Sequence, residues 1–144
     1  FNLGALLGLG GFGSEAVGLF LHITYLRKKY WDKYISLSFP RINPVQGYVV
    51  KNPVSEFDLF RLVAAFRILF PDLNLVLSTR ERPFVRDNLV EYGITQMSAE
   101  SKTNPKGYSG NNSAEQFDIR DSRSIAEIQN MLKSKNISVV WKNW

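Results

Sequence analysis

Short apolar runs alternate along this chain with longer segments in which apolar residues recur at helical spacing. The short runs predict five β-strands, at residues 3–9, 34–39, 73–77, 94–98 and 137–141. The longer segments predict four α-helices, at residues 14–30, 55–70, 83–92 and from 124 onward. The order is therefore βαβαβαβαβ, which is typical of a parallel sheet with its helices outside it.

Residues suited to helix ends mark the boundaries of these helices. Ser14, Ser55 and Ser124 are suitable N-caps, and Glu127 completes a capping box with Ser124. Gly93 suits the position just after a helix. Two α/β folds fit this order: a doubly wound open sheet, and a (βα)8 barrel of which four units would be half. In both folds, ligands bind at the carboxyl ends of the strands.

Polar and charged side chains follow three of the predicted strands. The set comprises Ser38, Arg41, Ser78, Thr79, Arg80, Glu81, Ser98, Glu100, Ser101 and Lys102. The ends of parallel strands converge on one face, where cations beside hydroxyls suit a carboxylate or another anion. The local alternative is a capping box formed by Ser78 and Glu81. Pro83 favours a helix that begins later, which leaves Arg80 and Glu81 available for a ligand.

A glycine-rich turn follows the first predicted strand. Gly8–Gly13 matches G-x-G-x-x-G between a strand and a helix, which is the placement that a dinucleotide site requires. The acidic partner of that motif should close the second strand. Asp32 precedes this strand, however, and the strand ends in Ser38 to Arg41 without an acid. A plain glycine-rich βα turn is therefore the favoured interpretation.

Composition narrows the possible chemistry. The 144 residues contain no cysteine and one histidine, which excludes disulfides, thiolate catalysis and multi-histidine metal sites within them. The formal net charge of +5 is weak evidence for nucleic-acid binding, so no such partner is expected. No apolar run reaches the roughly 20 residues of a membrane span, and no basic signal segment opens the chain. We therefore expect no membrane association and a cytoplasmic location. Because the chain starts at Phe1 and opens directly into a strand, we expect a piece of a longer protein.

Three segments, taken in order, resemble a known family. They are SFPRINP at 38–44, LSTRE at 77–81 and MSAESKTNPKGY at 97–108, with further support from QF at 116–117 and VWKNW at 140–144. Together they resemble the aromatic-amino-acid lyases of the radical S-adenosylmethionine superfamily. The closer likeness is to tyrosine lyases of thiamine thiazole biosynthesis. The tyrosine lyases of hydrogenase maturation, which carry a cysteine-containing extension at the corresponding place, are the alternative. A non-catalytic nucleotide- or anion-binding α/β module is the alternative from another class.

The resemblance implies the C-terminal half of a (βα)8 barrel, with residues 1–144 as a single domain and the cluster-binding half missing. It implies a [4Fe–4S] cluster and S-adenosylmethionine as cofactors of the whole protein, in which a 5′-deoxyadenosyl radical activates L-tyrosine. The Cα–Cβ bond then breaks to give 2-iminoacetate (dehydroglycine) and p-cresol. Thiazole synthase is the implied protein partner.

The same resemblance assigns roles to residues of this sequence. Arg80 would bind the tyrosine carboxylate, and Ser98 would help to hold the amino-acid group. The residues that would line the pocket are Ser78, Thr79 and Arg41. Glu81 would orient Arg80.

A further segment resembles the part of the family that lies near the adenine of S-adenosylmethionine. It contains Gly4, Leu6 and Gly8, with Gly11 at the place of the expected glutamate. The cluster ligands are expected in the missing half, so the isolated chain is expected to be inactive. A half barrel also exposes two sheet edges, and such edges tend to pair, so we expect the isolated chain to self-associate.

Overall fold

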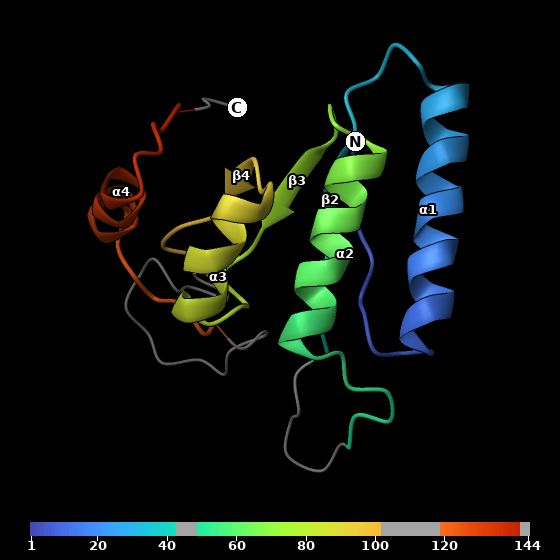
Figure 1. Ribbon diagram of the computed structural model, residues 1–144, viewed down its shortest axis with the longest axis horizontal. Helices are drawn as coiled ribbons and strands as arrows, with labels where there is room; N and C mark the ends of the chain where they lie inside the picture. The colour runs from blue at the N-terminus through green and yellow to red at the C-terminus, as the bar shows by residue number, and fades with distance from the viewer. Residues whose placement is uncertain (43–48, 102–118, 142–144) are drawn as a thin grey trace, which may run out of the picture.

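The computed structural model describes residues 1–42, 49–101 and 119–141 (Figure 1). Strands and helices alternate as the sequence predicts. In chain order the elements are β1 (Asn2–Gly4), α1 (Phe12–Lys29), β2 (Ser36–Ser38), α2 (Glu56–Leu69), β3 (Asn74–Leu77), α3 (Pro83–Leu89), a 3-10 turn η1 (Val90–Tyr92), β4 (Gln96–Met97) and α4 (Ile125–Ser134). None of the helices in these segments combines the length and apolar character needed to cross a membrane.

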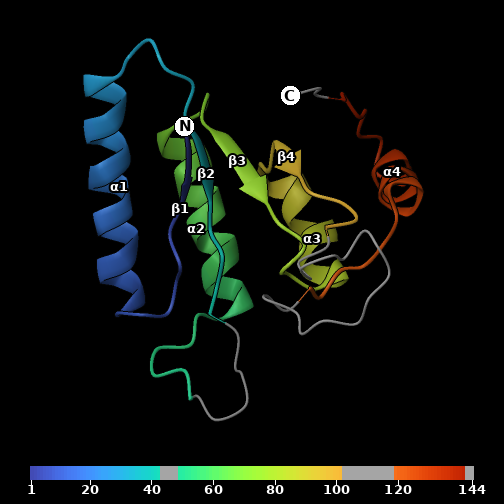
Figure 2. The ribbon, with the colours of Figure 1, turned by 180° about the vertical axis from the view of Figure 1, so that it is seen from behind.

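The strands form one parallel sheet in the order β1-β2-β3-β4. Leu3, Leu37 and Leu75 share a register, so their side chains lie on one face of the sheet. They belong to a core that also takes in residues of α1, α2 and α3, and these helices therefore pack on that face (Figure 2). A doubly wound sheet instead reverses its strand order and carries helices on both faces. The predicted parallel α/β fold with about four βα units is confirmed, and its topology is that of half a (βα)8 barrel.

The opposite face of the sheet is polar. By strand alternation, one row on this face consists of Asn2, Ser36 and Asn74. The hydroxyl of Ser36 donates to the amide oxygen of Asn2 (3.2 Å), and the Asn74 amide donates to Gln96 of β4 (2.8 Å). In a closed barrel this face would line the interior, where side chains from neighbouring strands form such layers.

Three of the predicted helix ends are confirmed. The hydroxyl of Ser55 caps α2 by accepting a hydrogen bond from the backbone N–H of Asp58 (3.0 Å). Ser124 and Glu127 form the predicted capping box at the start of α4. Gly93 follows η1 with a φ of 111°, a left-handed conformation that strongly favours glycine.

The predicted start of the first helix is wrong. Helix α1 begins at Phe12, with Gly11 rather than Ser14 in the N-cap position. The reason lies in the glycine-rich turn, which is closed by the side chain of Glu15 from the first turn of α1. The backbone N–H of Glu15 donates to the Gly11 carbonyl (3.1 Å), so the helical hydrogen bonds are already established at that point.

The fifth predicted strand is also wrong, because residues 137–141 lie in neither a helix nor a strand. Asn136 has a left-handed backbone conformation, with a φ of 59°. The backbone N–H of the next residue, Ile137, therefore turns back and donates to the carbonyl of Leu132 (2.9 Å). This hydrogen bond closes the end of α4. Helix α4 stands beyond β4, and its buried residues Ile128 and Leu132 are not part of the sheet–helix core (Figure 1).

Candidate functional site

The structure places the predicted polar residues at the carboxyl ends of β2, β3 and β4, an edge that we call the mouth. Arg41 follows β2, the run from Ser78 to Glu81 follows β3, and Ser98 follows β4. The backbone N–H of Ser98 donates to the carbonyl of Leu77 (3.0 Å), which joins the ends of β3 and β4. Lys102 lies outside the described residues, as do the segments 103–108, 116–117 and 142–144 that contribute to the resemblance.

Arg41 and Glu81 form a buried ion pair at the mouth. The guanidinium engages both carboxylate oxygens, with 2.9 Å between Nε of Arg41 and Oε1 of Glu81. The side chains of Arg41 and Glu81 are only 12% and 6% exposed. Arg41 also donates to the carbonyl of Val54 (2.9 Å), just before α2. The partner of Glu81 is therefore Arg41 and not the predicted Arg80, because Arg41 reaches the carboxylate across the two adjacent strand ends.

Ser78 and Arg80 are half-buried at the mouth, whereas Thr79 between them is 3% exposed. The backbone N–H of Arg80 faces the hydroxyl of Ser78 (3.4 Å), at the long end of hydrogen-bond distances. The carbonyl of Thr79 accepts from the backbone N–H groups of Arg120 and Asp121, both at 3.1 Å. Thr79 thus anchors the chain that returns toward α4, and Ser78 and Arg80 are the more exposed members of the run.

The sequence did not reveal a network of buried charges beside the mouth. Arg86 of α3 donates to the carboxylate of Asp121 and to the carbonyl of Ser98, and the side chains of Arg86 and Asp121 are 0% exposed. Arg123 bridges Asp121 (Nε to Oδ1, 2.9 Å) and Asp87 of α3 (2.7 and 3.0 Å). Arg86 and Asp87 are neighbours in the sequence, and Asp121 lies 35 residues after Arg86. Neither spacing follows a helix or strand period, so only the folded structure reveals this network.

Burial and ion pairing shift the pKa of three members of this network. Burial lowers the pKa of the Arg86 guanidinium, although Asp121 opposes this shift. Burial would raise the pKa of the Asp121 carboxyl, but hydrogen bonds from Arg123 and the charge of Arg86 outweigh it and hold that pKa below its ordinary value. Hydrogen bonds to Asp121 and Asp87 raise the pKa of Arg123. The lowered pKa of Asp121 and the raised pKa of Arg123 both favour the charged forms of these two groups.

The glycine-rich turn next to the mouth is held by a carboxylate. Glu15 accepts hydrogen bonds from the backbone N–H groups of Gly8 (2.9 Å) and Gly10 (2.7 Å). Gly8 is buried at a φ of 104°, and a Cβ there would lie 3.0 Å from the Asn52 carbonyl oxygen. Of the three residues assigned to the cofactor, Gly8 therefore shapes the turn. Gly4 and Leu6 are exposed, with Leu6 at 40%.

The described residues can be tested against the cofactors that the resemblance implies. The sequence has no cysteine, and the described segments contain no group of three or more histidine, aspartate or glutamate side chains placed to hold a metal ion. These residues therefore do not ligate an iron–sulfur cluster. The exposed backbone at Gly4 and the apolar side chain of Leu6 do fit a flat heterocycle such as adenine.

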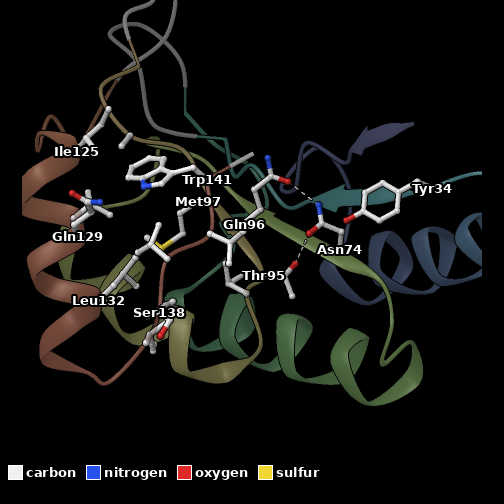
Figure 3. Close-up of a pocket in the computed structure, with 17 residues that line it drawn as sticks. Tyr34, Asn74, Thr95, Gln96, Met97, Ile125, Gln129, Leu132, Ser138 and Trp141 are labelled. Atoms are coloured by element: carbon white, nitrogen blue, oxygen red, sulfur yellow. Dashed lines mark hydrogen bonds between the residues drawn. The ribbon is translucent and has the colours of Figure 1, made fainter. Parts of the chain in front are cut away.

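A cavity of about 550 Å³ lies between β4, α4 and the segment that follows α4 (Figure 3). Met97, Leu132 and Trp141 supply apolar walls. On the sheet side, Asn74 accepts from the hydroxyl of Thr95 (2.6 Å) and donates to Gln96. The cavity borders β4, and none of the predicted site residues is among the described residues that line it.

Comparison with known proteins shows close relatives. The chain is 37% identical, over an alignment of 148 residues, to the 2-iminoacetate synthases of Salmonella typhimurium (strain LT2) and Escherichia coli (strain K12). Each alignment covers 99% of this chain and 39% of the relative, so the chain spans about two fifths of the length of these curated relatives.

Solved structures agree with this relationship. HydG, a maturase of the [FeFe]-hydrogenase, superposes with a TM-score of 0.85 at 33% identity, over 94% of this chain and 30% of that chain. HydG from Carboxydothermus hydrogenoformans superposes with a TM-score of 0.80 at 39% identity, over 94% of this chain and 32% of the HydG chain. The family described as the Biotin and Thiamin Synthesis associated domain matches residues 38–138. With that match over most of its length, the chain belongs to the Biotin and Thiamin Synthesis associated domain family.

Proposed function

We propose that this chain forms the substrate-binding part of a tyrosine lyase of the 2-iminoacetate synthase type. The observation that carries the proposal is the 37% identity to 2-iminoacetate synthases across 99% of the chain. In the proposed reaction the Cα–Cβ bond of L-tyrosine breaks. The side chain leaves as p-cresol, and the remaining carbons and the amino nitrogen leave as 2-iminoacetate.

Arg80 is the proposed anchor for the tyrosine carboxylate. Glu81 engages Arg41 through both oxygens, so Arg41 serves the mouth mainly as a buried support. A guanidinium grips a carboxylate with two parallel hydrogen bonds, and Ser78 and Ser98 add polar groups on either side. Fixing the carboxylate at the mouth decides which tyrosine atom meets the reactive centre, and such orientation is a large part of catalysis.

The whole protein is proposed to use S-adenosylmethionine and a [4Fe–4S] cluster, which when bound would supply the radical that starts the reaction. Within this chain, Gly4 and Leu6 are the proposed contacts for S-adenosylmethionine. Because these residues provide no cluster ligand, we propose that the isolated chain is inactive. A cluster spectrum together with p-cresol formation by the reconstituted chain alone would contradict this.

The substitution Arg80→Ala in the full-length protein tests the site. Without the guanidinium, we expect p-cresol formation to fall at least about 100-fold while the iron–sulfur absorbance is unchanged, because charged hydrogen bonds to the substrate are lost. Arg61→Ala is the matched control, since this arginine lies on the outer side of α2 and is 64% exposed. Unchanged p-cresol formation in Arg80→Ala would reject the assignment of the site.

A lyase of hydrogenase maturation is the second candidate, and the likeness to two HydG structures favours it. Genetic complementation separates the two: the first restores growth without added thiamine, and the second restores hydrogenase activity. The non-catalytic module is tested by the same protein preparation. Tyrosine binding without p-cresol formation by the reconstituted full-length protein would support it and reject both lyases.

Two partners complete the proposal. Thiazole synthase is the proposed acceptor of 2-iminoacetate, and co-purification with the full-length protein tests this pairing. The isolated chain is proposed to self-associate through its sheet edges, because β1 pairs only with β2 and β4 only with β3 among the described strands. A monodisperse monomer in sedimentation would contradict the second statement.

A further inference from the structure

The ends of β3 and β4 are joined by a closed ring of hydrogen bonds. On one side of the ring, the N–H of Ser98 donates to the carbonyl of Leu77 (3.0 Å). On the other side, Arg86 donates to the carbonyl of Ser98 and to the carboxylate of Asp121. The N–H of Asp121 then donates to the carbonyl of Thr79 (3.1 Å), which returns the ring to the end of β3.

Before the ring, β4 is held to β3 by a short ladder and by hydrogen bonds of Thr95 and Gln96 with Asn74. This strand has only two residues, Gln96 and Met97, and it is an edge strand of the sheet. Strand ends with few ladder bonds are among the first parts of a fold to open. The position of Ser98 relative to Arg80 at the mouth therefore depends on the ring.

Stability alone does not account for the pair of Arg86 and Asp121. Both side chains are 0% exposed, and the neighbouring α3 residues Val85 and Leu89 are fully buried and apolar. Replacing a buried ion pair by apolar groups of similar volume is often neutral or stabilising, because charges lose hydration when they are buried. An apolar pair would hold α3 in place, but it would not bind the Ser98 carbonyl.

We propose that Arg86 and Asp121 are positioning residues for the substrate: they set the distance between Ser98, which follows β4, and the Ser78–Arg80 run, which follows β3. The proposal rests on the proposed tyrosine lyase function, whose substrate would lie between these two strand ends. Neither residue touches the substrate. Arg86 acts through the Ser98 carbonyl, and Asp121 acts through Arg86 and the Thr79 carbonyl.

The test compares two double variants of the full-length, cofactor-loaded protein. R86M/D121N opens the ring by removing both hydrogen bonds of Arg86, while the amide oxygen that replaces the Asp121 carboxylate can still accept from Arg123. R123M/D87N is the matched control, because it removes the same two kinds of charge from the same network. It also removes the hydrogen bonds from Arg123 to Asp121, but it leaves the hydrogen bonds of Arg86 to Ser98 and Asp121 in place. The assays are the KM for L-tyrosine, the KM for S-adenosylmethionine and the melting temperature.

The KM for L-tyrosine should rise at least about tenfold in R86M/D121N and stay at the wild-type value in the control. The KM for S-adenosylmethionine should be unchanged in both, since Gly4 and Leu6 lie on the β1 side of the sheet. Both double variants should melt within about 4 °C of each other. A wild-type KM for L-tyrosine in R86M/D121N would overturn the proposal. So would a parallel rise of both KM values with a lower melting temperature, because that is a general loss of structure.

Two further measurements keep the test decisive. If R86M/D121N does not fold, Arg86→Lys replaces it, because one ammonium cannot span Ser98 and Asp121 as a guanidinium does. A wild-type KM for L-tyrosine in Arg86→Lys would likewise overturn the proposal. Amide hydrogen exchange gives a readout without catalysis: the N–H of Ser98 should exchange faster in R86M/D121N only. Absence of tyrosine cleavage by the wild type, with this exchange difference present, would reject the proposed function and leave the ring as a structural clamp.

Discussion

Loss of one member of the Arg41–Glu81 pair should destabilise the protein strongly, whereas loss of both should not. Glu81→Gln leaves the guanidinium of Arg41 buried without its counter-charge and places an amide N–H group against one of its donors. Removing one partner of a buried ion pair costs about 3–5 kcal/mol. The 12% and 6% exposed fractions of these two side chains put the pair in this buried class.

Arg41→Met/Glu81→Leu replaces the same pair by apolar groups of similar volume. We expect its free energy of unfolding to be within about 2 kcal/mol of the wild-type value, since the remaining loss is mainly the hydrogen bond to the Val54 carbonyl. The double variant should therefore be more stable than Glu81→Gln alone. Such a reversal is the signature of two groups that stabilise mainly each other.

Urea denaturation of the full-length protein, followed by circular dichroism, measures these free energies. Arg82→Met/Glu56→Leu is the control, because that ion pair is also held by α2 and the loop after β3 but is more exposed. It should change the free energy of unfolding by less than about 1 kcal/mol. The reasoning fails if Glu81→Gln costs less than about 1 kcal/mol, or if the single and double variants are simply additive.

Two other predictions follow from particular residues. Gly93→Ala should cost about 2–4 kcal/mol in urea denaturation, because the φ of 111° disfavours a side chain and a Cβ would lie 2.8 Å from Cγ of Arg67, which binds the Gly93 carbonyl. Gly18→Ala in α1, where a Cβ meets nothing within 4 Å, should be neutral or stabilising, and equal losses at both positions would contradict the argument. The third prediction concerns pH: the pKa of Asp121 is lowered in the folded protein, so its contribution to stability is present above the unfolded pKa and is lost as the pH falls through the folded pKa. Between about pH 5 and pH 3, the free energy of unfolding should therefore fall less steeply in Asp121→Asn than in the wild type. Parallel pH profiles of the two proteins would contradict this.

Local chemistry made much of the fold predictable. Ser55, Ser124 and Gly93 act at helix ends through hydrogen bonds or backbone angles that involve only nearby residues, and all three predictions are confirmed. The alternation of apolar runs likewise predicted the parallel sheet. The fifth strand failed for a non-local reason. A five-residue apolar run cannot show whether it will pair with a sheet edge, and residues 137–141 pair with none in the described structure.

The candidate site likewise has a part that the sequence predicted and a part that depends on the tertiary structure. The sequence by itself determined that Arg41, Ser78–Glu81 and Ser98 gather at one edge, because parallel strands place their carboxyl ends together. Only the tertiary structure decided which of them are partners. Glu81 binds Arg41 from another strand, and Ser98 is held by Arg86 and Asp121, a pair separated by 35 residues. Such pairings depend on how far side chains reach across the folded sheet, and the spacing of residues along the chain carries no record of that distance.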